Sequence, residues 1–180
     1  MTISDSIGAA SGRRLERKLF AKVAKSLEPG EEALVGFIAQ APGEISKNVG
    51  AITAVAGANL FNAGVRLGAL KALAPGAATP PISGTPLRAG LVLTDRALIE
   101  VTLNRSAMPK EAGARNPRDL LTGAAYLDGS YKVAGAEIRS GALFLRDGRV
   151  YVFEISLASR QKFEAFCALI DAHPEPRAES

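Results

Sequence analysis

The chain has 180 residues, of which 47% are hydrophobic and 6% aromatic, so we expect one domain with a mainly aliphatic core. A single cysteine excludes an internal disulfide. The net charge of +4 is unevenly placed, because residues 13–25 carry six cations and only one acid, Glu16. The rest of the chain is nearly neutral, which is atypical of a general nucleic-acid binder. Residues 1–12 lack the apolar run of a secretory signal, so we expect a cytoplasmic protein.

The N-terminal region, residues 1–27, is predicted to hold an amphipathic basic helix over residues 12–27. Its apolar residues recur every four positions, at Leu15, Leu19, Val23 and Leu27, with Phe20 beside them. The candidate contacts to anionic lipid are its cations, Arg13, Arg14, Arg17, Lys18, Lys22 and Lys25. We favour packing of the leucine face on the protein's own domain, with the cations solvated. The alternative is that the leucine face enters the headgroup region of an anionic membrane.

Residues 32–41 predict a strand, and a segment rich in Gly and Ala, residues 48–73, follows it without charge over its first 18 positions. Plotted as a helix, this segment places four glycines on one arc, as in close helix packing: Gly50, Gly57, Gly64 and Gly68. A membrane span needs about 20 mainly apolar residues, and Asn and Thr interrupt this one. We therefore favour a protein-packed helix or helical hairpin over a span or reversible membrane insertion. The predicted helical insertion covers residues 44–75, and a Pro/Gly-rich linker covers residues 74–89.

Short strands are predicted from residue 90 onward. Residues 91–93 and 97–101 flank a turn at Thr94-Asp95-Arg96, and residues 104–118 are polar and turn-rich, which predicts a loop. The remaining predictions are a strand over 120–127, a turn at Asp128-Gly129, a strand over 131–138, and a hairpin over 142–155 with a type I′ turn at Asp147-Gly148.

The last predicted element is a helix over residues 158–172, with Ser159 as its N-cap and a polar tail, residues 173–180, behind it. Its apolar face comprises Phe163, Phe166, Cys167 and Ile170. Several antiparallel strands followed by one amphipathic helix predict an α+β domain or a small barrel plugged by its final helix.

Four stretches, in this order, resemble the bacterial pleckstrin-homology-like (PH-like) domains. They are LEPGEEALVGFIAQ (27–40), GLVLTDRALIEV (90–101), GALFLRDGRVYVFEIS (141–156) and SRQKFEAFCALID (159–171). The resemblance implies one domain over residues 28–172, a bent antiparallel β-sandwich or barrel of about seven strands capped by the C-terminal helix. Two departures stand out: residues 44–89 form a long insertion between what would be early strands, and Ala97 replaces the second basic residue of the turn motif. Family members that bind phosphoinositides have a basic cluster around the first hairpin, where Lys47 is the only cation here. Phosphoinositide binding is therefore not carried over.

No catalytic constellation emerges from the sequence, so we expect no enzyme activity, no cofactor and no metal. His173 is the only histidine, at a helix end, and Cys167 is expected to be a small buried hydrophobe. The first functional hypothesis is a self-associating scaffold or an adaptor for a protein partner. The second is a peripheral membrane protein held by the basic helix and the Gly-rich segment at the inner membrane face. An enzyme or small-ligand carrier ranks third, and nucleic acid is an unlikely partner.

Overall fold

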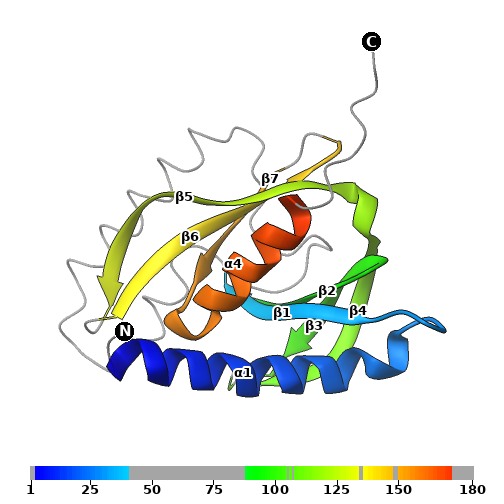
Figure 1. Cartoon of the computed structure of the whole chain (residues 1–180), viewed down its shortest axis with the longest axis horizontal. Helices are drawn as coiled ribbons and strands as arrows, with labels where there is room; N and C mark the ends of the chain where they lie inside the picture. Colours follow the sequence, from blue (N-terminus) through cyan, green and yellow to red (C-terminus); the bar gives the residue numbers. More distant parts are fainter. Residues whose placement is uncertain are drawn as a thin grey trace, which may run out of the picture.

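The computed structural model describes residues 3–40, 88–104, 106, 108–133, 136–147 and 150–171. The elements shown in Figure 1 are α1 (Ile3–Val23), η1 (Ala24–Ser26), β1 (Ala33–Gln40), β2 (Arg88–Thr94), β3 (Ala97–Leu103), β4 (Pro109–Pro117), η2 (Arg118–Leu120), β5 (Leu121–Val133), β6 (Ala136–Leu145), β7 (Val150–Ile155) and α4 (Leu157–Asp171). The chain is thus α+β, with a seven-stranded sheet and a C-terminal helix, as the sequence predicted at this level.

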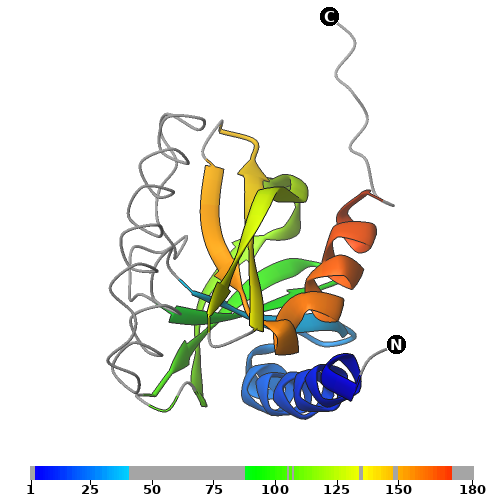
Figure 2. The same cartoon turned by 90° about the vertical axis from the view of Figure 1, so that its left-hand side faces the viewer.

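The sheet is antiparallel throughout and has the strand order β4-β3-β2-β1-β7-β6-β5. Strands β1 and β2 pair along their length, and so do β6 and β7, but β1 meets β7 only at Gln40 and Glu154. The two halves of the sheet, β1–β4 and β5–β7, diverge from this junction and enclose a space between them (Figure 2).

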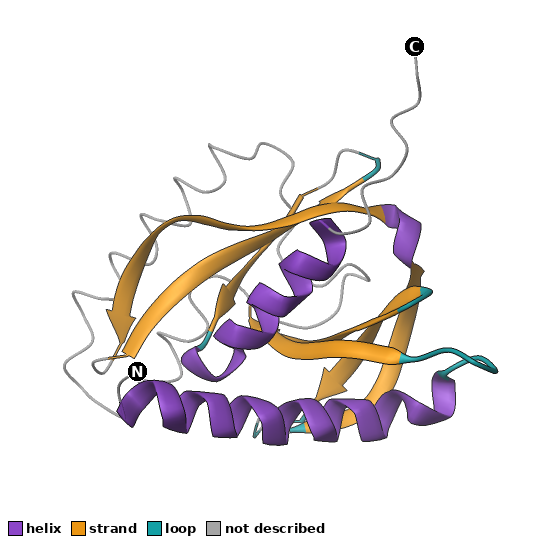
Figure 3. Cartoon of the chain, in the orientation of Figure 1, coloured by secondary structure: helices purple, strands orange, loops and turns teal. Residues whose placement is uncertain are grey.

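Helix α4 lies on the inner side of the bent sheet and fills that space (Figure 3). Phe163 and Phe166 of α4 are fully buried. The centroid of the Phe37 ring lies 5.3 Å from that of each of these two rings and 5.8 Å from that of Phe153. The Phe153 and Phe163 centroids lie 5.5 Å apart. A Cβ at Gly141 would come within 2.9 Å of the Phe163 ring, so a residue without a side chain is needed there. The core is therefore more aromatic around α4 than the low overall aromatic content suggested.

Helix α1 covers the outer face of the β1–β4 half (Figures 1 and 2). Leu19 and Val23 are fully buried in a second apolar cluster with residues of β2 and β3, namely Val92, Ala97, Ile99 and Val101. Successive residues of a strand point to opposite faces, so these strands are apolar on both sides because each side carries a helix.

The predicted loop over 104–118 is wrong, because residues 109–117 form β4 and pair with β3. In the described part of the chain, β4 pairs on one side only, and its residues are mostly half-buried or exposed. An edge strand of this kind needs no apolar alternation, and charged residues and proline are common in it. Its composition therefore resembles that of a loop.

The predicted turn at Asp128-Gly129 is also wrong, since both residues lie inside β5. The β5–β6 register shifts between Tyr126 and Ser130, so the strand accommodates these residues as an irregularity rather than as a reversal. The reversal follows Val133, which pairs with Ala136, and the predicted strand over 131–138 is split between β5 and β6.

The hairpin over 142–155 is confirmed as β6 and β7, although the type of its turn depends on Gly148, outside the described residues. The C-terminal helix is confirmed as well, but Ser159 is not its N-cap. It lies inside α4, buried, where its hydroxyl accepts the backbone N–H of Ile38 at 3.3 Å and so connects α4 to β1.

Most of the predicted insertion and linker, residues 44–87, falls outside the described residues, and so do Gly50, Gly57, Gly64, Gly68, Lys47 and His173. The end of the predicted linker is corrected, because Arg88 and Ala89 already belong to β2. No helix of the described residues is long and apolar enough to cross a bilayer.

Candidate functional site

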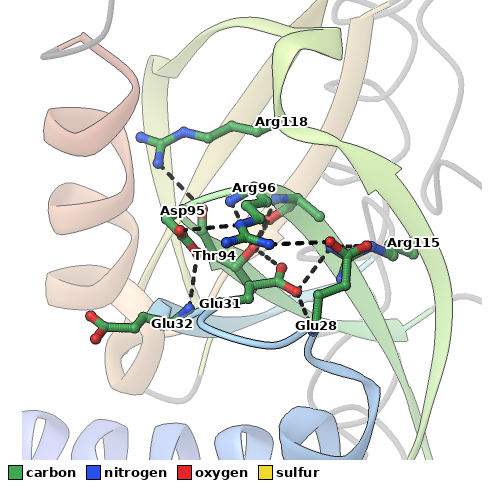
Figure 4. A network of polar contacts seen from close by, with 9 residues as sticks. Glu28, Glu31, Glu32, Thr94, Asp95, Arg96, Arg115 and Arg118 are labelled. Carbon is green, nitrogen blue, oxygen red and sulfur yellow. Dashed lines mark hydrogen bonds and ion pairs between the residues drawn. The ribbon is translucent and has the colours of Figure 1, made fainter.

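A polar cluster joins the start of β1 to the β2–β3 turn and to β4 (Figure 4). It begins at the turn Glu28-Pro29-Gly30-Glu31, in which the N–H of Glu31 donates to the carbonyl of Glu28 at 3.0 Å. Gly30 has φ +76°, a conformation that glycine adopts at little cost. We call this group of residues the Glu31 cluster.

The carboxylate of Glu31 lies at its centre and has no solvent-exposed side-chain surface. It accepts the backbone N–H of Glu28 at 2.8 Å, the hydroxyl of Thr94, and the Nη2 of Arg115 at 2.9 Å. Burial by itself would raise the pKa of Glu31, but these hydrogen bonds and the charge of Arg115 outweigh burial and hold the pKa below its ordinary value. Glu31 is therefore ionised and fully paired.

The β2–β3 turn is organised by two side chains. The Thr94 hydroxyl accepts the N–H groups of Arg96 at 3.1 Å and Ala97 at 2.7 Å, while it donates to Glu31. Asp95 accepts the N–H of Glu32 at 2.9 Å, and its own N–H donates to the Glu32 carbonyl at 3.1 Å. The turn is thus fastened to the residues that open β1.

Three arginines complete the Glu31 cluster. Arg115 of β4 also meets Glu28 at 3.2 Å, and its hydrogen bond with Glu31 is the main reason that its pKa is raised. Arg96 meets Glu28 at 3.4 Å. Arg118 donates to the carbonyl of Thr94 at 3.3 Å and to that of Leu169 at 3.0 Å, so it extends the connections to the end of α4.

The arrangement of the Glu31 cluster suits a structural role, in which it connects β1, the β2–β3 turn and β4, rather than a catalytic one. Both oxygens of Glu31 have partners, and a general base must reach the proton that it removes. Two stretches that carried the resemblance, LEPGEE and LTDR, meet here through Glu31 and Thr94. No three His, Cys, Asp or Glu side chains gather into a metal site within the described ranges.

A second polar group lies between β5, β6 and the first turn of α4. The Arg139 guanidinium stacks 3.9 Å from the centre of the Tyr126 ring, and the Tyr126 hydroxyl donates to the carbonyl of Arg160 at 3.2 Å. Arg160 in turn pairs with Glu137 at 2.9 Å. Burial raises the pKa of Tyr126 above its ordinary value, so this phenol stays protonated.

Cys167 is half-buried beside the inner core. Burial is the main cause that raises the pKa of its thiol to about 11. A thiol that stays protonated at neutral pH is a poor nucleophile, and the packing agrees with the small-hydrophobe role that the sequence suggested.

The six cations of the basic helix are distributed along α1 and η1. Arg13, Arg14, Arg17, Lys22 and Lys25 are exposed, and Lys18 is half-buried with its Nζ 4.0 Å from the sulfur of Met108. We call the exposed side of α1 that carries Arg13, Arg14, Arg17, Lys18 and Lys22 the cationic face. The structure therefore keeps these charges together on one element.

Close contacts hold α1 in place beneath its cationic face. A Cβ at Gly90 would come within 2.3 Å of Leu19, and one at Gly36 within 3.4 Å, so Leu19 occupies a notch that two glycines leave in β1 and β2. A Cβ at Gly12 would lie 2.2 Å from the carbonyl oxygen of Ala158 in α4. Gly12, Gly36 and Gly90 thus permit the close packing of α1 in the described part of the chain.

Glu16 completes the docking of α1. Its side chain is only 13% exposed, forms an ion pair with Lys162 of α4 and accepts the backbone N–H of Gly36 in β1 at 3.3 Å. Sequence reasoning counted Glu16 only as a minor offset to the cations. Its position within the apolar stripe, between Val23 and Phe20 around the helix, was the available signal, because an acid there must leave solvent when the stripe is buried.

Comparison with models of known protein families, with curated proteins and with solved structures found no match for this chain.

Proposed function

We propose that the chain is a non-enzymatic interaction module with a PH-like core, acting as a scaffold or adaptor that self-associates or binds a protein partner. The bent seven-stranded antiparallel sheet, with α4 packed on its inner face, supports the proposal of a PH-like core, since this is the coarse architecture that the resemblance implies. The contact of the LEPGEE and LTDR stretches through Glu31 and Thr94 supports it further.

The observation that carries the scaffold role is the pairing of the last residue of β1 with the first residue of β2. Strand β1 ends at Gln40 and β2 begins at Arg88, and these two residues are paired. Both ends of residues 41–87 are therefore attached at adjacent positions of a packed sheet. The glycine pattern of this stretch predicts close packing against another chain segment, and the sheet supplies the platform.

Light scattering on the full chain tests self-association. We expect an oligomer whose mass falls in Gly57→Leu and Gly64→Leu, because a large side chain blocks close approach. Gly76→Leu, off the predicted glycine arc, is the control and should leave the mass unchanged. A monomeric wild type at all concentrations would overturn self-association.

A second candidate function is peripheral attachment to an anionic lipid surface through α1. The exposure of Arg13, Arg14, Arg17 and Lys22 on one docked helix favours it. Co-sedimentation with vesicles of phosphatidylcholine and phosphatidylserine at low salt is the test. We expect binding that disappears in vesicles of phosphatidylcholine alone, and an absence of binding to both kinds of vesicle would overturn this candidate.

A further inference from the structure

We propose that α1 binds an anionic bilayer by charge alone, docked on the sheet and lying flat on the headgroups without inserting its apolar face. This inference rests on the second candidate function, and it specifies the mode of attachment. It differs from the sequence-based alternative, in which the leucine face enters the membrane.

The apolar face of α1 has little free surface to offer a membrane, since its most accessible members, Leu15 and Phe20, are half-buried. Leu19 and Val23 are fully buried against β2 and β3, and Gly12 lies against the backbone of Ala158. Insertion would require α1 to leave the sheet, which would expose the outer apolar cluster and separate the Glu16–Lys162 ion pair. Charge contact requires none of these changes.

The cationic face points directly away from the sheet. At about 100° per residue, the cations Arg13 to Lys22 span roughly 180° of the helix, and the buried positions from Gly12 to Val23 centre on the opposite side. Exposed Ala10 and Ala21 lie in the middle of the cationic arc. Small side chains there allow the helix axis to approach a flat surface while the long cationic side chains spread over it.

The composition of this face favours lipid over a protein or a nucleic acid. Protein interfaces depend on buried aromatic or aliphatic anchors, whereas the exposed large hydrophobic side chain of the described residues, Phe144, belongs to β6. Single-stranded nucleic acids are bound with aromatic side chains on which bases stack, and the exposed residues between the cations of this arc are Ala10, Ser11 and Ala21. A bilayer provides many mobile anionic headgroups, and each cation near it contributes about 1 kcal/mol.

The position of the charges is tested with two matched double variants in the same vesicle assay. Arg14→Glu with Arg17→Glu alters the cationic face, and Lys132→Glu with Arg146→Glu makes the same change in net charge on β5 and after β6. We expect at least a 30-fold loss of affinity in the first, from about 1 kcal/mol per cation, and a much smaller loss in the second. Equal losses would overturn the inference, and so would tighter binding to duplex DNA or to polyglutamate than to the vesicles at the same salt.

The absence of insertion is tested by fluorescence. The chain has no tryptophan, so Phe20→Trp or Leu15→Trp reports on the apolar side of α1 alone. We expect the bound protein to show no quenching by lipids brominated on their acyl chains, and we expect 0.5 M salt to release it. Binding with strong quenching would overturn the inference and leave membrane attachment standing, whereas failure of the wild type to bind would overturn the second candidate function itself. Circular dichroism of both variants checks that α1 remains folded.

Discussion

The Glu31 cluster and the cationic face of α1 hold comparable numbers of charged side chains and use them in opposite ways. In the cluster, the charges of Glu31 and Arg115 face each other 2.9 Å apart, and the carboxylate is sealed from solvent. On α1, Arg13, Arg14, Arg17 and Lys22 are exposed, and Glu16, the one acid of residues 13–25, points inward to Lys162. Inward charges connect elements and set stability, whereas outward charges are available to a partner.

The largest effect is expected when the central acid of the Glu31 cluster is removed. We expect Glu31→Ala to lower the free energy of unfolding by about 2–3 kcal/mol, because it removes the buried charged acceptor of the Glu28 N–H, the Thr94 hydroxyl and Arg115. Arg115 keeps its ion pair with Glu28, and the Thr94 hydroxyl can still donate to the carbonyl of Ala97. Urea denaturation measures the change. Its neighbour Glu32 is exposed and joins the cluster through its backbone, so Glu32→Ala should stay within about 0.5 kcal/mol of the wild type. Equal effects of the two substitutions would contradict the assignment of Glu31 as the central acid.

A smaller loss is expected where α1 crosses α4. Gly12→Ala places a Cβ 2.2 Å from the carbonyl oxygen of Ala158, which belongs to the backbone and cannot rotate away. We expect a loss of about 1–3 kcal/mol by thermal or urea unfolding, as for overpacking in general. Gly113→Ala in β4 is the control, because the nearest atom to its Cβ would lie at 3.5 Å. Unchanged stability of the Gly12 variant would show that α1 is not held at this crossing.

The third expected effect is on the pH dependence of the free energy of unfolding, to which Glu31 of the cluster contributes. The folded-state pKa of Glu31 is lowered from its ordinary value of 4.5, so its contribution is complete above that value and is lost as the pH falls through the folded pKa. We expect the free energy of unfolding to fall with acid from about pH 4.5 downward, and Glu31→Gln to show a shallower fall. The comparison is made by urea denaturation at a series of pH values. Parallel curves would mean that other carboxylates cause the acid sensitivity.

The smallest effect is expected on the cationic face. Reversal of Arg14 and Arg17 should change the free energy of unfolding by no more than about 0.5 kcal/mol, since both side chains are exposed. Thermal unfolding at low and at moderate salt measures it. A loss above 1 kcal/mol would show that these arginines help to hold the fold and would weaken the case that they serve a partner.

Several elements were predictable because their signals are local. The β6–β7 hairpin follows from two runs of strand-forming residues around Asp147, and α4 follows from the spacing of Phe163, Phe166 and Ile170. Strand β4 was missed because an edge strand buries little, so its sequence carries no alternation. The register irregularity at Asp128-Gly129 was missed because the same dipeptide also suits a turn.

The candidate sites divide in the same way. The spacing of the cations in the sequence already places them on one side of a helix, because helical periodicity depends only on spacing. The packing of the elements in space is what docks the opposite side on β1–β4, turns Glu16 inward, and brings Glu31 to Thr94 and Arg115. Glu31 and Thr94 are 63 positions apart in the chain, and Glu16 and Lys162 are 146 positions apart. Which of these distant groups meet is determined by the packing of the whole sheet rather than by any local pattern.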